Sequence, residues 1–313
     1  MEREELIKLA KKARAQGAFP SLSEEELAAL PVKQKELGVP VSEGSVRVYE
    51  FRPDPENKRS LPMLINFHGG GFIKGRADRD QVYCSNMAAR TGALVWDVDY
   101  ALAPENPFPA AVNQCYDIIR YAFAHAKELN VDPERILLIG HSAGSNLAAA
   151  ACIRASEGAA FRASERTASR ASEGASFRPA GMILDYMPAD QMKNPLSKLS
   201  PQQRGDAKRV ARAKMERQYL DFYLQPEEAL SPLASPILAS EEILGTFPDC
   251  LVVSAGEDSL RDECEAFAHK LAASGVTVTL RRFIHSRHGF TINRVDEYQK
   301  ALALHEQFIL NHI

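Results

Sequence analysis

Ile136-Leu137-Leu138-Ile139-Gly140-His141-Ser142-Ala143-Gly144 is an apolar run that ends in a tight turn with a serine at its centre. An alanine-rich, helix-prone run follows at residues 147–151. A serine between a strand and a helix has an exposed hydroxyl and lies beside backbone amides that point at the group it attacks. The pentapeptide Gly-x-Ser-x-Gly also occurs in structural turns. The strand before it and the helix after it favour Ser142 as a nucleophile.

Apolar runs alternate with helix-prone segments along much of the chain. We expect helices around residues 80–90, from 109 to about 129, and after 291. We expect strands at residues 46–51, 63–67, 93–99, 136–139, 181–185, 250–254 and 276–280. This order predicts an α/β fold with a mostly parallel central sheet and helices on both faces.

Length, charge and cysteine content narrow the function classes. The 313 residues, 45% of them hydrophobic, suffice for one large core, and the net charge of −3 with no basic, aromatic-rich cluster argues against a nucleic-acid partner. The charged amino terminus and the lack of a long apolar segment predict a soluble cytoplasmic protein with no membrane partner. The cysteines form no CxxC pair, so we expect buried free thiols at Cys84, Cys115, Cys152, Cys250 and Cys264.

A near-repeat interrupts the alternation of strands and helices. Residues 155–162 recur with small changes at 171–178, and both copies consist mainly of small and charged residues. Such a composition buries too little apolar surface to form a core of its own. We therefore expect residues 153–178 to be a solvated, low-complexity insertion after the nucleophile helix.

A second interruption, at about residues 188–236, is polar and helix-prone. Together with the amino-terminal segment, residues 1–45, it is expected to form a helical cap over the site. The catalytic domain is then residues 46–313, which include both interruptions. The alternative is that these segments are only surface helices.

A serine nucleophile needs an oxyanion hole, and a glycine-rich loop supplies a candidate. His68-Gly69-Gly70-Gly71-Phe72 comes directly after an expected strand. Consecutive glycines let backbone amides approach a developing negative charge with no side chain between them. Glycine runs are often merely flexible loops, but the strand and the flanking aromatic residues favour an oxyanion hole here.

The nucleophile also needs a base and an acid that orients the base. Glu257, Asp258 and Asp262 compete as the acid after the strand at 250–254. Asp262 suits the first turn of a helix, where a carboxylate stabilises the amide end, so Asp258 is the best orienting residue.

Two of the eight histidines remain as candidates for the base. His68 and His141 belong to the two turns, and His285 and His288 lie in the loop after the last strand. A solvated surface role is expected for the four histidines in predicted helices, which are His125, His269, His305 and His312. The spacing alone does not decide whether His285 or His288 is the base.

Four segments together make the chain similar to the hormone-sensitive-lipase family of α/β-hydrolase esterases, in its bacterial branch. They are His68-Gly69-Gly70-Gly71-Phe72, Asp99-Tyr100-Ala101-Leu102-Ala103-Pro104-Glu105 with Pro107-Phe108-Pro109-Ala110-Ala111-Val112, Gly140-His141-Ser142-Ala143-Gly144, and Asp258-Ser259-Leu260-Arg261-Asp262-Glu263. The resemblance runs from about Val46 to the end of the chain, without the repeat insertion.

The resemblance implies a role for each residue of a Ser-His-Asp triad. Ser142 would attack an ester carbonyl, Asp258 would orient the base, and the base would be His288, because the family base directly precedes Gly-Phe as in His288-Gly289-Phe290. His285 becomes the lesser candidate. The amides of Gly70, Gly71 and Ala143 would form the oxyanion hole, with Gly69 shaping the turn. No metal or organic cofactor is implied.

The elbow departs from the family pattern in two positions. The family commonly has Asp before the nucleophile and Gly after the motif, where this chain has His141 and Ser145. The family arginine after Asp-Tyr is replaced by Ala101. These changes leave the serine and the amides intact, so they bear on substrate preference more than on catalysis.

The sequence thus predicts a carboxylesterase that hydrolyses small-molecule esters with short acyl chains through an acyl-serine intermediate. The alternatives are an arylformamidase or other amide hydrolase with the same triad, a lipase for long chains, and a non-catalytic receptor on this fold. A lipase usually needs a broad apolar lid, and the cap segment here is polar. Its basic residues are Lys193, Lys198, Arg204, Lys208 and Arg209. The resemblance also suggests a homodimer formed through the last strand and helix.

Overall fold

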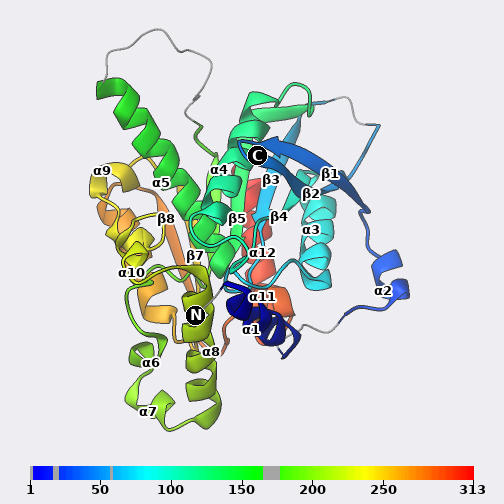
Figure 1. Ribbon diagram of the computed structural model, residues 1–313. Coiled ribbons are helices and arrows are strands. Elements are labelled where there is room, and N and C mark those ends of the chain that lie inside the picture. Colours follow the sequence, from blue (N-terminus) through cyan, green and yellow to red (C-terminus); the bar gives the residue numbers. More distant parts are fainter. Residues whose placement is uncertain (1–2, 17–20, 57–58, 165–176) are drawn as a thin grey trace.

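A computed structural model describes residues 3–16, 21–56, 59–164 and 177–313. Its strands form one sheet in the order β1-β2-β4-β3-β5-β6-β7-β8 (Figure 1). The first two pairings are antiparallel and the others are parallel, which confirms the predicted fold class. The strands are β1 Gln34–Val41, β2 Gly44–Phe51, β3 Leu61–Phe67, β4 Leu94–Asp99, β5 Val131–His141, β6 Gly181–Asp185, β7 Asp249–Ala255 and β8 Val278–Phe283.

Helices cover both faces of the sheet. Helices α3, α11 and α12 pack on one face, and α4, α5, α9 and α10 pack on the other. The helices are α1 Arg3–Gln16, α2 Glu24–Ala28, α3 Asp78–Thr91, α4 Ala110–Ala124, α5 Ala143–Ser164, α6 Pro195–Lys198, α7 Pro201–Arg204, α8 Ala207–Tyr223, η1 Glu228–Leu230, η2 Pro236–Leu238, α9 Glu241–Leu244, α10 Arg261–Ala273, α11 Phe290–Asn293 and α12 Tyr298–Leu310.

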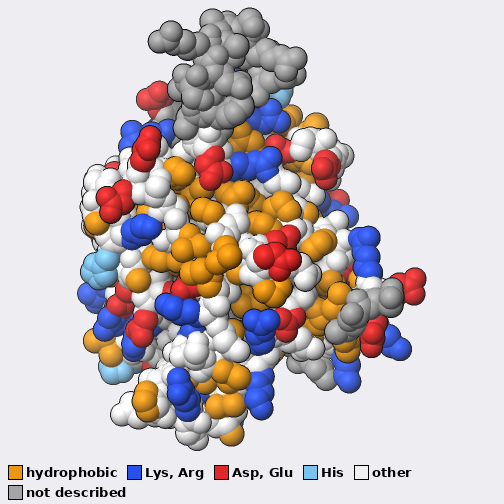
Figure 2. Space-filling view, turned by 60° about the vertical axis from the view of Figure 1, so that its left-hand side comes forward, with side chains coloured by type: hydrophobic (Ala, Val, Ile, Leu, Met, Phe, Trp, Pro, Cys, Tyr) orange, Lys and Arg blue, Asp and Glu red, His pale blue; other side chains and the backbone are white. Residues whose placement is uncertain are grey.

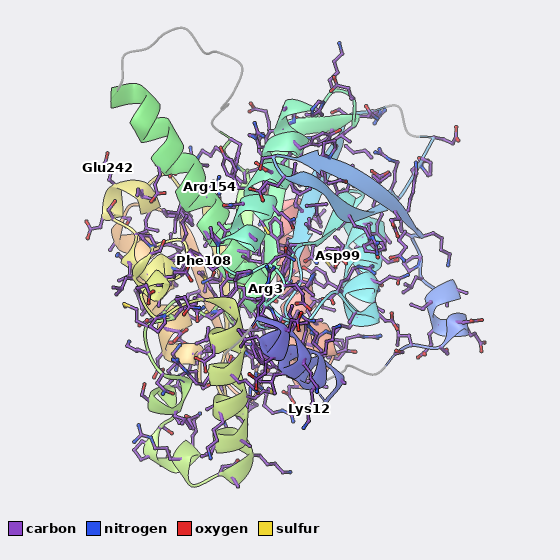
Figure 3. The ribbon with its side chains drawn as sticks, viewed as in Figure 1. Arg3, Lys12, Asp99, Phe108, Arg154 and Glu242 are labelled. Atoms are coloured by element: carbon purple, nitrogen blue, oxygen red, sulfur yellow. The ribbon has the colours of Figure 1, made fainter. Side chains whose placement is uncertain are left out.

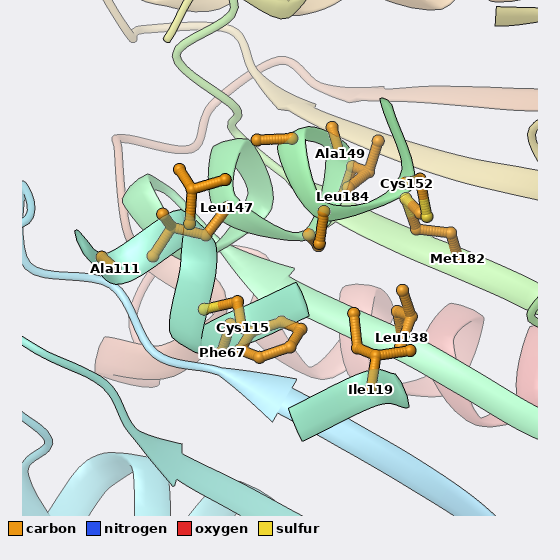
Figure 4. Close-up of a cluster of buried hydrophobic side chains, with 14 of the residues drawn as sticks. Phe67, Ala111, Cys115, Ile119, Leu138, Leu147, Ala149, Cys152, Met182 and Leu184 are labelled. Carbon is orange, nitrogen blue, oxygen red and sulfur yellow. The ribbon is translucent and has the colours of Figure 1, made fainter. Parts of the chain in front are cut away.

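The central parallel strands are buried on both faces, which explains their unbroken apolar sequences. All seven residues of β3 are buried. Successive side chains of a strand point to opposite faces, so Phe67 belongs to the cluster beneath α4 and α5 and Leu64 to the cluster beneath α3 and α12. Figure 4 shows the first cluster, in which side chains of β3, β5, β6, α4 and α5 meet. The five cysteines are buried and free, as predicted.

Several boundaries differ from the sequence-based expectation. Helix α4 ends at Ala124 rather than near residue 129, and β5 begins at Val131. The expected cap segment at residues 1–45 contains strand β1, so the sheet begins before residue 46. Val39 is the only buried residue of β1, and Leu37 and Val41, which alternate with it, are partly buried. Gly38 and Pro40 lie between these apolar residues and weaken the indication of a strand in the sequence.

The interruption after the nucleophile continues as helix. Helix α5 extends to Ser164, into the expected insertion at residues 153–178, and projects beyond the sheet (Figure 1). Residues 165–176 lie outside the part of the chain that the structure describes.

Figure 2 shows that hydrophobic side chains gather in the centre of one face of the molecule, with acidic and basic side chains around them.

Helix α1 is fixed to the body of the protein by Arg14. The Arg14 guanidinium donates hydrogen bonds to the carbonyl of Ala103 at 2.7 Å and to the Glu105 carboxylate at 2.6 Å. Figure 3 labels Arg3 and Lys12 on this helix. No helix of the described residues is both long enough and apolar enough to cross a membrane.

Candidate active site

The turn between β5 and α5 holds Ser142 in an unusual backbone conformation. Its φ is +54°, which non-glycine residues seldom adopt. The Ser142 amide donates a hydrogen bond to the carbonyl of Asp185 at the end of β6, at 2.9 Å. The surrounding structure therefore holds the serine at the apex of the turn, a position in which strain often accompanies function.

Both motif glycines are required by the close packing of this turn. A Cβ on Gly144 would lie 1.9 Å from the carbonyl oxygen of Phe67, and one on Gly140 would lie 2.5 Å from the backbone nitrogen of Ser145. The helix after the nucleophile consequently packs directly against β3. This contact brings Ser142 next to the glycine loop that follows β3. A Cβ on Gly69 of that loop would lie 3.5 Å from the Cβ of Ser142.

Three side chains from distant parts of the sequence form a continuous hydrogen-bonded series. His288 Nε2 lies 2.8 Å from Ser142 Oγ, and His288 Nδ1 lies 2.6 Å from Asp258 Oδ2. Ser142, Asp258 and His288 follow β5, β7 and β8. The carboxyl ends of these parallel strands meet at one edge of the sheet, so the topology itself assembles the three residues.

The environment of Asp258 favours its ionised form. Burial by itself would raise the pKa of Asp258, but the charge and hydrogen bond of His288 and the charge of Arg212 hold that pKa below its ordinary value. Its other oxygen accepts a hydrogen bond from the Leu260 amide at 3.2 Å. Asp258 is thus a buried, fixed anion against the ring of His288.

The competing acids and the competing base lie elsewhere. Asp262 is exposed and pairs with Arg261, and Glu257 is exposed and pairs with Arg209 of α8 at 3.1 Å. His285 is also exposed, and its backbone amide donates to Glu297. None of these three borders the cavity described below.

One expectation about the histidines is wrong. His305 of α12 is completely buried rather than solvated, because its helix packs against the sheet. Its Nε2 lies 3.0 Å from Asp185 Oδ1, and its Nδ1 lies 3.0 Å from the hydroxyl of Tyr83. Asp185 also contacts Nδ1 of His141 at 3.0 Å. A buried polar network therefore lies beneath the nucleophile turn.

The glycine loop lies opposite the nucleophile. His68 stacks on Tyr100 with 4.2 Å between ring centroids, and the Tyr100 hydroxyl donates to the His68 carbonyl at 2.7 Å. These contacts support the loop from behind. Gly70 and Gly71 have φ values of +136° and +61°, and a Cβ on Gly71 would lie 2.6 Å from the ring of Tyr219. Only glycine fits a loop with this backbone and this neighbour.

A cavity of about 260 Å³ opens above the serine. Its floor includes Gly70, Gly71, Ser142, Ala143 and His288. Helices α6 and α8 supply much of its wall through Pro195, Lys198, Arg212, Met215, Glu216, Tyr219 and Leu220. Of the described residues before position 46, none lines the cavity, since α1 packs against the loop around Glu105 instead.

Sequence reasoning missed the wall residues of α8. Arg212, Glu216 and Tyr219 are spaced by four and three residues, so they share one face of the helix. That spacing is visible in the sequence, but nothing in it says that this face turns toward Ser142. Among the described residues, no group of three or more His, Cys, Asp or Glu side chains is arranged to hold a metal ion.

Comparison with known proteins identifies the family of this chain. Residues 64–292 match the family described as alpha/beta hydrolase fold. The carboxylic ester hydrolase LipN of Mycobacterium tuberculosis is 31% identical over 82% of this chain and 63% of its own length. Human hormone-sensitive lipase is 36% identical over a match that covers 39% of this chain and 11% of that protein. An esterase of Pyrobaculum calidifontis superposes with a TM-score of 0.80 and 29% identity, covering 99% of this chain and 97% of that one.

The chain belongs to the α/β-hydrolase-fold family. Within that family it is a carboxylesterase-type enzyme of the hormone-sensitive-lipase-like group. The matched range contains Ser142, Asp258, His288 and the glycine loop.

Proposed function

We propose that the protein hydrolyses carboxylic esters with short acyl chains, with Ser142 as nucleophile, His288 as general base and acid, and Asp258 as the residue that orients His288. The hydrogen-bonded series from Asp258 through His288 to Ser142 Oγ carries this proposal. Serine hydrolases use this arrangement to activate a hydroxyl that is otherwise a weak nucleophile.

Acylation is the first half of the reaction. Ser142 Oγ attacks the ester carbonyl carbon while its proton passes to His288 Nε2, and the carbonyl oxygen becomes an oxyanion. The carbonyl then re-forms, the bond to the alcohol oxygen breaks, and His288 gives the proton to the departing alcohol. An acyl-serine remains. The Asp258 carboxylate stabilises the transiently charged imidazolium.

The amides of Gly70, Gly71 and Ala143 are proposed to bind the oxyanion. Within the described chain, no protein acceptor takes a hydrogen bond from the amides of Gly70 and Gly71. Ala143 is the first residue of α5, where backbone amides have no acceptor within the helix. Donors of this kind each contribute about a hundredfold or more in rate when they are fixed in advance.

Deacylation repeats the same chemistry with water. A water molecule attacks the acyl carbon and loses a proton to His288, and the carbon–Oγ bond breaks as His288 returns that proton to Ser142. The products are a carboxylic acid and the free enzyme. Each proton that His288 accepts is therefore returned within one turnover.

The size of the cavity supports short acyl chains. Pockets that bury drug-sized ligands usually measure roughly 300–1,000 Å³. The present cavity, about 260 Å³, is smaller and must hold both parts of the ester. Long-chain lipids therefore fit this site poorly.

Hydrolysis of 4-nitrophenyl esters from acetate to palmitate, alongside an aryl formamide, tests the proposal. We expect turnover to peak at acyl chains of about two to six carbons, because longer chains exceed the cavity. A peak at long chains would indicate a lipase, and faster cleavage of the formamide would indicate an amide hydrolase. No turnover of any compound would favour the non-catalytic receptor.

Three variants assign the roles. Ser142→Ala and His288→Ala should each lower kcat by about 10⁴-fold or more, because the triad works as a unit. His285→Ala is the matched control and should keep kcat near that of wild type, since His285 is exposed and lies outside the cavity. A larger loss in His285→Ala than in His288→Ala would overturn the assignment of the base.

We also propose that the protein forms a homodimer through β8. This strand pairs with β7 on one side, and in the described chain its other edge has no partner strand. Exposed strand edges commonly pair with another chain. Light scattering that gives the mass of a single 34.5 kDa chain at micromolar concentration would refute the dimer.

A further inference from the structure

The walls of the cavity above Ser142 carry an excess of basic side chains. Among the described residues, Glu216 is the only acidic residue that lines this cavity. The basic residues that line it are Lys74, Arg79, Lys198 and Arg212. They come from the loop after β3, from α3, from α6 and from α8, so they surround the space from several sides.

The carboxylates that balance these cations mostly lie behind the cavity wall. Asp80, which lies 3.9 Å from Arg79, is completely buried, and Glu263, which lies 2.6 Å from Lys198, is also buried. Neither lines the cavity. Asp258 is likewise buried and contacts His288. The positive groups therefore border the substrate space, while the carboxylates of Asp80, Glu263 and Asp258 are separated from it. Glu216 does line the cavity and pairs with Arg212 at 2.9 Å.

Lys74 is the cation that is best placed to meet a substrate. Its amide donates to the Gly70 carbonyl at 3.0 Å, so it is fixed beside the proposed oxyanion loop. Its ammonium group lies 5.5 Å from the centre of the Tyr219 ring, which packs against Gly71. Lys74 thus lies within reach of a group attached to an ester that is bound at Ser142.

The cations also influence each other across the cavity. Burial lowers the pKa of Lys74, and the positive charges of Arg79 and Arg212 lower it further. Like charges that are held together in a partly dry space repel, and a bound anion relieves that repulsion. A ligand that carries a negative charge is therefore stabilised more strongly here than a neutral ligand of the same shape.

We propose that the natural substrate is an ester that carries a carboxylate or an equivalent anion, held by Lys74 with the support of Arg79 and Arg212. This inference rests on the proposed ester hydrolysis at Ser142 and specifies its substrate class. The anion belongs either to the acyl part or to the alcohol part of the ester. Both parts lie in the same basic cavity, so the two cases share one recognition chemistry.

Two matched substrate pairs test the proposal and separate the two cases. The first pair carries the charge on the alcohol part and compares 4-acetoxybenzoate with neutral 4-acetoxybenzamide. The second pair carries it on the acyl part and compares mono-4-nitrophenyl succinate with neutral 4-nitrophenyl 4-oxopentanoate, after subtraction of the enzyme-free rate. The measured quantity is the ratio of kcat/KM for the anion to kcat/KM for its neutral partner.

The ratio is measured for wild type and for Lys74→Met. Because the intrinsic reactivity of each ester is the same with both enzymes, a change in the ratio reports on Lys74 alone. We expect the ratio to fall by about tenfold or more in Lys74→Met for at least one pair, because a charge-assisted contact is lost. The matched control is Lys208→Met, which changes an exposed lysine of α8 outside the cavity and should leave the ratio unaltered. Equal ratios in wild type and Lys74→Met for both pairs would overturn the proposal.

A measurement on the unaltered protein decides the question if Lys74→Met fails to fold. Benzoate and benzamide compete with 4-nitrophenyl butanoate, and benzoate should inhibit at a concentration about tenfold lower, with an advantage that shrinks at high salt. Equal inhibition by the two compounds would refute anion binding. Failure of the proposed function is a different result, because the neutral esters would then also show no Ser142-dependent turnover.

Discussion

At the residue scale, Asp185 connects the nucleophile turn to the far face of the sheet. Its carbonyl accepts a hydrogen bond from the Ser142 amide, and its buried carboxylate contacts the rings of His141 and His305. Burial alone would raise the pKa of Asp185, but the charges and hydrogen bonds of the two histidines hold that pKa well below its ordinary value. The chain therefore maintains a buried anion directly beneath its proposed nucleophile.

Substitution of this anion should be costly. We expect Asp185→Asn to lower the free energy of unfolding at pH 7 by about 3 kcal/mol, because one histidine N–H is left without its charged acceptor. Because the folded-state pKa is depressed, this stabilisation is present above the ordinary value of 3.8 and is lost as the pH falls below it. Urea unfolding at several pH values measures both effects.

Asp249 provides the control for this substitution. It contacts His312 at 3.5 Å, but its side chain is 45% exposed. Asp249→Asn should therefore cost less than about 1 kcal/mol. Equal losses in the two variants would show that burial of the Asp185 network does not contribute to stability.

At the element scale, a buried ion pair joins α6 to α10. Helix α6 belongs to residues 188–236, which we propose to form the cap and which are called the cap below. Lys198 Nζ lies 2.6 Å from Glu263 Oε2, and the two side chains are 5% and 6% exposed. Burial raises the pKa of Glu263 to about 7 although Lys198 lowers it. Glu263 also accepts a hydrogen bond from the backbone amide of Asp190, and this bond strengthens the junction.

The stability of this junction should depend on pH in a defined direction. A raised folded-state pKa means that wild type loses stability as the pH rises from 4.5 to about 7, with no further loss from Glu263 above that. Lys198→Met removes the compensating charge and raises the pKa further, so its losses continue above pH 7. The difference in unfolding free energy between wild type and Lys198→Met should therefore grow from pH 6 to pH 9.

Lys193 is the matched control for the element-scale prediction. It pairs with Asp190 at 3.1 Å, but its side chain is 64% exposed. Lys193→Met should change stability by less than about 1 kcal/mol at every pH. A difference between wild type and Lys198→Met that does not vary with pH would contradict the role of Glu263.

At the scale of the whole molecule, the cap and the sheet share one hydrophobic core. Tyr219, Phe222 and Tyr223 of α8 belong to the same buried cluster as Phe67 of β3. The ring of Tyr223 stacks on Phe72 of the glycine loop, with 3.9 Å between centroids. Loss of cap packing must therefore disturb the loop and the sheet together.

We expect the cap and the sheet to unfold in a single transition. Tyr223→Ala should lower the free energy of unfolding by about 3 kcal/mol, because it leaves a cavity at the junction of cap and loop. Fluorescence of Trp96, the single tryptophan, reports on the sheet, and a dye on Lys208→Cys reports on the cap, since the five native cysteines are buried. Two separate urea midpoints would show that the cap unfolds on its own.

Much of the fold was predictable because local sequence and final position agree. The central strands are continuous apolar runs, and turns or helices separate them, so their parallel arrangement follows from connection rules. Strand β1 was not predicted although Leu37, Val39 and Val41 alternate along it, because Gly38 and Pro40 between them are typical of turns. The burial of His305 was not predicted because the partner, Asp185, lies 120 positions away in sequence.

The sequence by itself determined the parallel strands of the sheet, the serine turn between β5 and α5, and the position of the glycine loop after β3. These features depend on backbone conformation and on neighbours close in the chain. Only the tertiary structure brought Ser142, His288 and Asp258 within hydrogen-bonding distance of one another. It also turned the face of α8 that carries Arg212, Glu216 and Tyr219 toward Ser142. Such choices depend on distances between segments that are remote in sequence, and local pattern contains no information on those distances.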